Sequence, residues 1–582
     1  MDGPGKAAAT HTEGVKVDLK AAEADPAEGC GFCLKRIRDF VPQKYRNELA
    51  QLFKLAGPVV ISQLMIFMIS FVSMVFCGHL GKTELAGVSL SIAVRRLSGI
   101  LVSFCFAERL SACFAQTYGS GNLKRVGVIL QRGVLILLLA CFPCWAVLIN
   151  TEPLLLAVKQ SPEVARLALS LCYFLQAAFM YQLQGRYLQN QGIIWPQVIT
   201  GAIGNVLNAI INYVFLYPLN MGVAGSAVAN AISQYVLAVI LFAYICLKGL
   251  HKATWGGWSL DCLQEWGSFI QLAIPSMLML CLEWWIFEVG GFLAGVISEV
   301  ELGANSVIYE LAIVAYMFPL GFAAAASVRV GNALGAGNIE QAKLSCKVPI
   351  VCAFIIACVV GAILGACKDI IGYIFTSDQD ILLRVSDVMI IFCFTHLCDA
   401  VAGVTGGVLR GAGKQLIGAL CNLVGYYVIG FPIGVSLMFA AKMGIIGLWT
   451  GLTVCVLMQS IFFLIHVSKL NWEKAVKEAL VRAGVQSKEE KDMIKMENSG
   501  ELENTNLITT CISLRTYTTS RDEEDHVYQE THPSEQSKPT TAVGDVLSGT
   551  QLVLWRGLAV LVMFIILAAG IVASHFLTKM LK

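Results

Sequence analysis

The sequence predicts an all-α polytopic membrane protein, with two six-helix lobes related by a pseudo-two-fold repeat and a thirteenth helix at the C-terminus. Three observations support this fold class. The 582 residues are 56% hydrophobic and only 14% charged, whereas about a quarter of a typical soluble chain is charged. Long apolar runs recur along the whole sequence, and short motifs in its first half return in its second half.

Thirteen apolar stretches are long enough to cross a bilayer as helices, which takes about 20 residues. They occupy residues 54–77, 85–115, 127–149, 164–184, 194–217, 223–247, 267–295, 302–327, 346–372, 384–407, 416–440, 444–467 and 549–582. The lipid bilayer is therefore expected to be the main environment of this chain.

The spans define five regions. Residues 1–50 form a polar N-terminal segment, 51–249 the first six-helix lobe and 250–468 the second. Residues 469–548 are too polar to bury much apolar surface, so we expect a disordered cytoplasmic linker there. Residues 549–582 then form the thirteenth span, and with an odd number of spans the C-terminus is extracellular if the N-terminus is cytoplasmic.

Lysine and arginine in the short loops indicate the orientation, because they accumulate on the cytoplasmic side. With the N-terminus inside, the cytoplasmic loops hold most of these residues, among them Lys124, Arg125, Lys248, Arg410 and Lys414. The outer loops hold fewer, such as Lys82 and Lys442. The distribution predicts a cytoplasmic N-terminus.

An internal repeat relates the two lobes. The motif LAGPVV at 55–60 returns as LAIPSM at 272–277, and their prolines differ in sequence number by 275 − 58 = 217. GSGN at 119 returns as GAGN at 335, an offset of 335 − 119 = 216, and MGVAG at 221 returns as MGIIG at 443, an offset of 443 − 221 = 222. A repeat unit of six helices gives both lobes the same orientation, with a pseudo-two-fold axis along the membrane normal.

Four carboxylates cluster inside predicted spans of the second lobe, namely Glu283, Glu288, Glu310 and Asp399. The first lobe has no carboxylate at the positions equivalent to the first two. Each costs roughly 2.5–3.5 kcal/mol at the membrane centre on insertion scales, so packing alone does not account for all four. Glu283 and Glu288 are about 140° apart around a helix, so we expect one to line a cavity while the other faces a neighbouring helix.

A cluster of buried acids can hold either protons or an organic cation, and competition between the two is the minimal chemistry of an antiporter. Low dielectric and neighbouring negative charge favour the protonated carboxyl. Aromatic side chains nearby offer faces to a cation; the candidates are Trp284, Tyr309, Tyr316 and Tyr426. No cofactor, enzymatic motif or metal site is expected, and a net charge of +2 does not favour nucleic acid as a partner.

Several motifs resemble those of the animal multidrug and toxin extrusion (MATE) transporters. They include VFCGHLGKTELAGVSL, QTYGSGNLKRVGVILQRG, LAIPSMLMLCLEWWIFEVG, SVRVGNALGAGN and GGVLRGAGKQ. The resemblance covers roughly residues 45–470 and extends to the thirteenth span. It implies a central cavity and proton-coupled export of organic cations across the apical plasma membrane of kidney and liver cells. It also places Glu283, Glu288 and Glu310 at the family's functional glutamates, with Asp399 at a fourth.

The second span departs from that family pattern, because it contains Arg95, Arg96, Glu108 and Arg109. We expect these charges to face water or to pair with other helices. Three alternative functions also remain: a sodium-coupled multidrug exporter, a lipid flippase on a related fold, and a non-transporting receptor or scaffold that acts through its tail. Hard-cation sites need several oxygen ligands, which the spans do not obviously supply.

Overall fold

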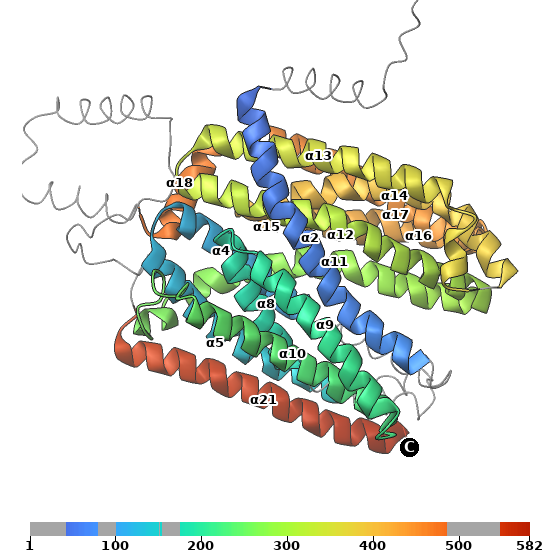
Figure 1. Ribbon diagram of the computed structural model, residues 1–582, viewed down its shortest axis with the longest axis horizontal. Coiled ribbons are helices and arrows are strands. Elements are labelled where there is room, and N and C mark those ends of the chain that lie inside the picture. The colour runs from blue at the N-terminus through green and yellow to red at the C-terminus, as the bar shows by residue number, and fades with distance from the viewer. Residues whose placement is uncertain are drawn as a thin grey trace, which may run out of the picture. The chain divides into compact units, whose positions relative to one another are not determined.

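The computed structural model describes residues 42–78, 101–150, 152–153, 175–376, 378–485 and 547–581. Contacts divide the chain into two units, Met1–Glu48 and Leu49–Lys582, and both lobes lie within the second unit. The described residues are helical with short turns (Figure 1).

In the described residues, the first lobe contains six helices. They are α2 (Gln43–Gly78), α4 (Leu101–Gly119), α5 (Leu123–Ile149), α8 (Leu175–Asn190), α9 (Trp195–Leu216) and α10 (Gly222–Leu247). A short linker with a 3-10 turn, η2 (Leu260–Leu263), leads to the second lobe.

The second lobe repeats the same order of helices. It contains α11 (Trp266–Ile297), α12 (Glu299–Gly335), α13 (Ile339–Ala366), α14 (Gln379–Gly411) and α17 (Ile445–Ser468), with a 3-10 turn, η3 (Ile371–Ile374), before α14. Its fifth span is a composite helix made of α15 (Gln415–Asn422), η4 (Leu423–Gly430), α16 (Phe431–Val435) and η5 (Ser436–Ala440). After α17, the described part of the chain contains α18 (Trp472–Ala483) and α21 (Gly549–Leu581).

Eleven helices in the described ranges are long and apolar enough to cross a membrane. They correspond to eleven of the thirteen predicted spans. The other two, 85–115 and 164–184, are described only over α4 and α8, so the full number stays a prediction. Arg95 and Arg96 lie outside the described residues, as do the side chains of Glu108 and Arg109.

The repeat read from the sequence recurs in the local backbone. Asn122 caps the start of α5 by accepting a hydrogen bond from the Arg125 amide, and Asn338 caps α13 by accepting one from the Gln341 amide. The preceding residues, Gly121 and Gly337, have φ angles of 76° and 74°, which favour glycine. The same turn therefore joins equivalent helices in both lobes.

The two lobes meet where α4 packs against α12. A Cβ atom added to Gly119 would lie closer than 3.0 Å to the backbone of Asn332, and one added to Gly335 would do the same with Gln116. Gln116 and Asn332 have the same sequence offset as the two glycines, since 332 − 116 and 335 − 119 both equal 216. The contact is thus symmetric about the pseudo-two-fold axis and depends on small residues that let the backbones approach.

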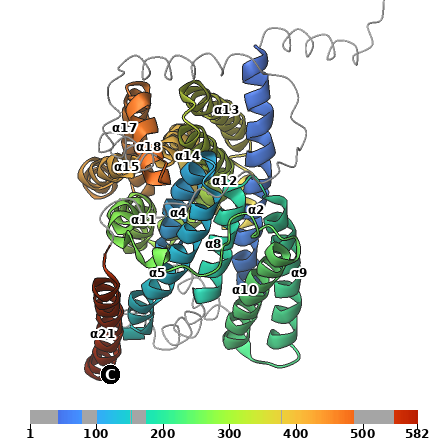
Figure 2. The same ribbon diagram turned by 90° about the vertical axis from the view of Figure 1, so that its left-hand side faces the viewer.

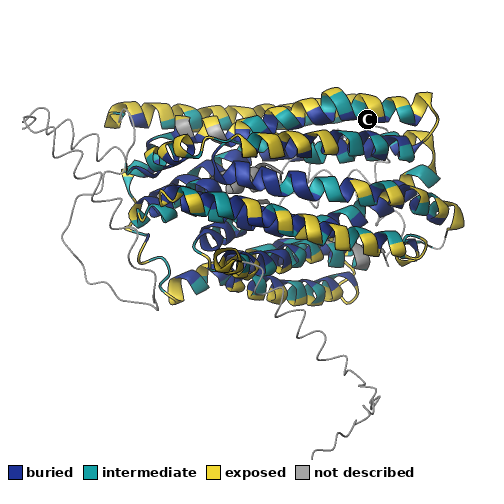
Figure 3. Cartoon of the chain, turned by 90° about the horizontal axis from the view of Figure 1, so that it is seen from above, coloured by how far each residue is buried: buried dark blue, intermediate teal, exposed yellow. Residues whose placement is uncertain are grey.

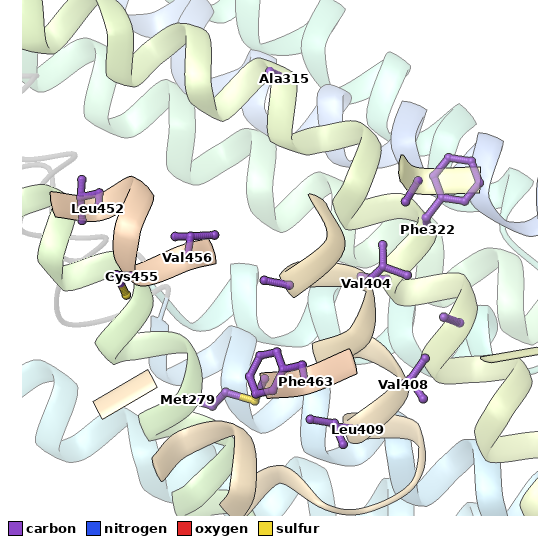
Figure 4. Packing of buried hydrophobic residues seen from close by; sticks show 14 of the residues in the cluster. Met279, Ala315, Phe322, Val404, Val408, Leu409, Leu452, Cys455, Val456 and Phe463 are labelled. Carbon is purple, nitrogen blue, oxygen red and sulfur yellow. The ribbon is translucent and has the colours of Figure 1, made fainter. Parts of the chain in front are cut away.

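Exposed and buried faces follow the pattern expected in lipid. Apolar residues stand on the outer surface, for example Ile199, Ile203, Val206 and Ile210 along α9, and the exposed residues lie on the outward faces of the helices (Figure 3). α12 has the most buried candidate span. Its apolar side chains pack with those of α11, α14 and α17 in one core (Figure 4).

Helix α21 lies alongside α5 of the first lobe (Figure 1). The Asn150 side-chain amide donates to the carbonyl of Gly570 at 2.8 Å, and the Ser574 hydroxyl donates to the carbonyl of Ile149 at 3.2 Å. Near its start, the Arg556 side chain donates to the carbonyl of Leu263 at 2.8 Å. The extra helix is therefore docked on the first lobe and on the linker between the lobes.

Helix α18 lies within residues 469–548, for which the sequence predicts disorder, so the prediction is wrong for this part of the segment. Asn471 caps its start, Gly484 ends it with a φ of 75°, and one face made of small apolar residues is buried, namely Ala475, Val476, Ala479 and Ala483. Composition averaged over the whole segment hid this short amphipathic stretch. The rest of the segment, from 486 to 546, lies outside the described residues.

The α4–α12 contact makes a testable prediction. Gly335→Ala places a methyl group against the Gln116 backbone, so we expect it to destabilise the protein by about 1–3 kcal/mol and lower its melting temperature. Gly557→Ala is the matched control, because nothing lies within 4 Å of that position in α21. Thermal unfolding of the purified protein in detergent measures both, and equal melting temperatures would contradict the close contact.

Candidate functional site

Two of the four predicted carboxylates line one cavity inside the second lobe. Glu283 comes from α11 and Asp399 from α14, and both belong to the lining together with Arg410 of α14. The remaining lining residues are Met279, Tyr316, Ala402, Gly403, Gly406, Asn422, Tyr426, Gln459 and Phe463. Met279 and Phe463 form the apolar part of this wall and lie close together in Figure 4.

The cavity brings two acids and one base together. When both carboxyls are ionised, Glu283, Asp399 and Arg410 sum to one negative charge. An isolated charge in low dielectric is costly, so a pairing cation is the usual compensation. The site therefore lacks one positive charge, which either a proton or a monovalent cation can supply.

Tyr316 holds Glu283 in place. Its hydroxyl donates to Glu283 Oε1 at 3.2 Å from α12. The tyrosine can lie across α14 because position 403 is glycine: a Cβ there would stand 2.9 Å from the tyrosine oxygen. Trp284 packs edge-on against the Tyr316 ring with centroids 6.4 Å apart, so it supports the tyrosine from behind.

The composite helix contributes a second group of polar side chains. Asn422 donates to the carbonyl of Met279 at 2.6 Å and accepts from Gln459 of α17 at 3.2 Å. Tyr426 follows in the π-helical segment η4 and is buried. Segments of π-helix frequently occur at functional sites, and here one presents a tyrosine to the cavity.

A one-residue difference between the lobes accompanies this π-helix. The turn glycines Gly192 and Gly413 have a sequence offset of 413 − 192 = 221, whereas the next pair, Gly222 and Gly444, has an offset of 444 − 222 = 222. The second lobe therefore has one more residue in this interval. Hydrogen bonds from i to i+5 accommodate such an extra residue without breaking the helix, and the equivalent helix α9 of the first lobe is a regular α-helix.

The other predicted site residues lie elsewhere. Glu288 accepts a hydrogen bond from the Tyr309 hydroxyl at 3.2 Å, and neither residue is part of the cavity lining. Glu310, on α12, and Trp284 are also not among the lining residues. This arrangement agrees with the expectation that Glu283 and Glu288 face different surroundings on one helix.

Three polar cavity residues are not among the predicted site residues. The sequence predicts a cytoplasmic loop at Arg410, but α14 extends to Gly411 and the arginine is buried, with an exposed fraction of 7%. Asn422 and Gln459 carry no charge, so the cost of burying a charge does not single them out. Their one sequence signal is that they are polar residues inside apolar spans.

The cavity is narrow in this conformation. It leaves about 10 Å³ for the centre of a water-sized sphere, which is near the minimum for a single water molecule. Sites for drug-sized ligands have volumes of about 300–1,000 Å³. An organic cation can therefore enter only after the surrounding helices move apart.

The first lobe contains a buried polar cluster of a different kind. It is made of uncharged side chains from α2, α9 and α10: Ser73, Asn208, Asn212, Asn230 and Ser233. Asn208 donates to Asn230 at 3.0 Å and to Ser233 at 3.2 Å. This cluster carries no formal charge. Of the two polar groups, the cavity in the second lobe is the one that contains ionisable side chains.

Two helical repeats with a buried polar cavity among their membrane-spanning helices are typical of one class of protein, the membrane transporters. The profile of the MatE family matches residues 58–214 and 275–436. The two matches begin at Pro58 and Pro275, the prolines that mark the internal repeat. The chain belongs to the MatE family, whose members are transporters and not enzymes.

Animal relatives match nearly the whole chain. Multidrug and toxin extrusion protein 1 of Danio rerio is 61% identical over 576 residues, covering 98% of each chain. Multidrug and toxin extrusion protein 2 of Mus musculus is 52% identical, covering 93% of this chain and 94% of its own. Multidrug and toxin extrusion protein 1 of Homo sapiens is 48% identical, covering 91% of this chain and 94% of its own.

A solved structure supports the fold. The eukaryotic MATE transporter AtDTX14 superimposes with a TM-score of 0.73 at 28% identity and covers 75% of this chain and 99% of its own. A MATE transporter in a bent conformation gives 0.66 at 17% identity, covering 75% of this chain and 100% of its own, which shows the fold alone. The predicted fold class is confirmed, apart from the exact number of spans.

The hydrogen bond from Tyr316 to Glu283 predicts that replacing Tyr316 weakens cation binding, whereas replacing Tyr309 does not. Tyr316→Phe removes the donor to Glu283 inside the cavity, so we expect cation affinity to fall about tenfold, the effect of roughly 1.4 kcal/mol. Tyr309→Phe is the matched control, because it removes an equal bond to Glu288 outside the cavity. Equilibrium binding of radiolabelled tetraethylammonium measures both variants, and an equal loss in the two would contradict this site.

Proposed function

We propose that this chain exports organic cations in exchange for protons across the plasma membrane. The observation that carries the proposal is the cavity in which Glu283 and Asp399 outnumber Arg410, leaving one negative charge to be neutralised. A proton and a monovalent organic cation compete for that charge. The curated relatives are named multidrug and toxin extrusion proteins, which supports drugs, toxins and endogenous amines as the substrates of this chain.

The proposed cycle needs only these groups. From the cytoplasmic side, an organic cation displaces a proton from the acid pair and occupies the cavity. On the outer side, a proton binds the same carboxylates and the cation leaves. The aromatic and apolar wall, with Tyr316, Tyr426 and Phe463, suits cations of varied shape, because cation–π and hydrophobic contacts are tolerant of geometry.

Protons are favoured over sodium as the coupling ion. A sodium site needs several oxygen ligands free to surround the ion. Here Asn422 Oδ1 already accepts from Gln459, and the Arg410 guanidinium shares the cavity and repels a bare cation. Glu288 on α11 and Glu310 on α12 lie outside the lining, and we propose that they take part in the exchange from positions beside the cavity. By resemblance to the animal transporters, we place the protein in the apical membrane of epithelial cells.

Removing the titratable charge of Glu283 tests the exchange site. Glu283→Gln keeps the size of the side chain, so we expect uptake of tetraethylammonium into proteoliposomes to fall at least tenfold while the protein still folds. Glu340→Gln is the control, because Glu340 is an exposed carboxyl paired with Lys343 on the surface. Normal uptake by a folded Glu283→Gln protein would remove this residue from the mechanism.

The charge count predicts an electroneutral exchange. One proton for one monovalent cation moves no net charge, so the membrane potential, worth about 2.3 kcal/mol per charge per 100 mV, contributes nothing. One pH unit contributes about 1.4 kcal/mol, which limits accumulation to tenfold. In proteoliposomes, a pH gradient should raise uptake severalfold and a potential at fixed pH should not change it. A strong dependence on potential, or a requirement for sodium, would overturn the proposal.

A further inference from the structure

Helix α18 lies across the joint between the two lobes. It packs against α4 of the first lobe and against α12 and α13 of the second, and Figure 2 shows it among the helices at one end of the bundle. That end carries Lys124, Arg125, Lys343 and Lys414, which the distribution of basic residues assigns to the cytoplasm.

The second lobe holds α18 firmly. The Lys414 ammonium contacts both carboxylate oxygens of Glu478, at 2.7 and 2.9 Å. The Arg482 guanidinium donates to the carbonyls of Ala412 at 3.3 Å and Gly413 at 3.4 Å, in the turn after α14. The chain between α17 and α18 is also short, from Ser468 to Trp472. We therefore expect α18 to move with the second lobe.

The first lobe also contacts α18, at the turn between α4 and α5 and the start of α5. The Asn122 side-chain amide donates to the carbonyl of Ala483 at 3.2 Å. Gly484 follows with its Cα against the Arg125 side chain, where a Cβ would stand 3.1 Å from a guanidinium nitrogen. The contacts of α18 to Asn122 and Arg125 therefore cross from one lobe to the other.

Loading of the cavity from the cytoplasm requires this joint to open. Transporters built from two repeats open alternately by rocking one repeat against the other, and here the close α4–α12 contact must separate at the end that α18 covers. We propose that α18 is a strap that keeps the cytoplasmic end closed and releases its contacts to Asn122 and Arg125 each time the transporter opens inward. This rests only on the chain being a transporter, whatever its substrate.

Reversible cross-linking tests the strap. In the Asn122→Cys/Ala483→Cys variant, a short bifunctional methanethiosulfonate joins α18 to the first lobe. We expect uptake of tetraethylammonium to stop on cross-linking and to recover after reduction. The matched control is Lys414→Cys/Glu478→Cys, which joins α18 to the second lobe and should leave uptake within about twofold of the uncross-linked protein. The single-cysteine variants, treated alike, account for the native cysteines.

Two results would overturn the proposal: full uptake with the first pair cross-linked, or an equal loss of uptake with both pairs. A second measurement needs no transport assay. Ala483 is fully buried, so a cysteine there reacts with an impermeant maleimide at the cytoplasmic face only when the strap lifts. Asn122→Asp still accepts from the Arg125 amide but cannot donate to the Ala483 carbonyl, so it should raise the labelling rate at least threefold. An unchanged rate in Asn122→Asp would contradict the strap even if Asn122→Cys proved unstable.

Discussion

The burial of Glu283 and Asp399 within membrane-spanning helices is the constraint on which the rest of the site depends. Carboxylates in that environment need positive charge or hydrogen-bond donors close by. Arg410 supplies one charge and Tyr316 one donor, which leaves the group one charge short. In the proposed function, this deficit is filled by a proton or by an organic cation in turn, which is why the two exchange.

The surrounding fold keeps this group in one lobe. Both lobes share the same helix order and the same capped turns at Asn122 and Asn338, yet the polar cluster between α2, α9 and α10 of the first lobe consists of serines and asparagines. The second lobe has the acids and the π-helical segment that carries Tyr426. A near-symmetric scaffold therefore supports an asymmetric site, and we propose that the symmetric α4–α12 contact is the place where the joint opens and closes.

Much of the fold was predictable because lipid imposes a simple pattern. The length of the apolar runs located the spans, and the offset between GSGN and GAGN located the repeat. Side-chain proximity was harder to predict. The pairing of Glu283 with Asp399, rather than with Glu288, depends on how α11 and α14 pack, and the reach of Arg410 into the cavity depends on where α14 ends. Helix α18 escaped prediction because its buried face consists of alanine and valine within a polar segment.

The central claim is that the transported cation binds in the second lobe between Glu283 and Asp399. The most direct measurement is a cryo-electron microscopy structure of the full chain with a bound organic cation that contains a heavy atom. The account predicts density within the cavity, with the cationic group near both carboxylates and a ring or alkyl part against Tyr316 and Phe463. A cation bound among Ser73, Asn208 and Asn230 of the first lobe, with the Glu283 cavity still closed, would contradict it.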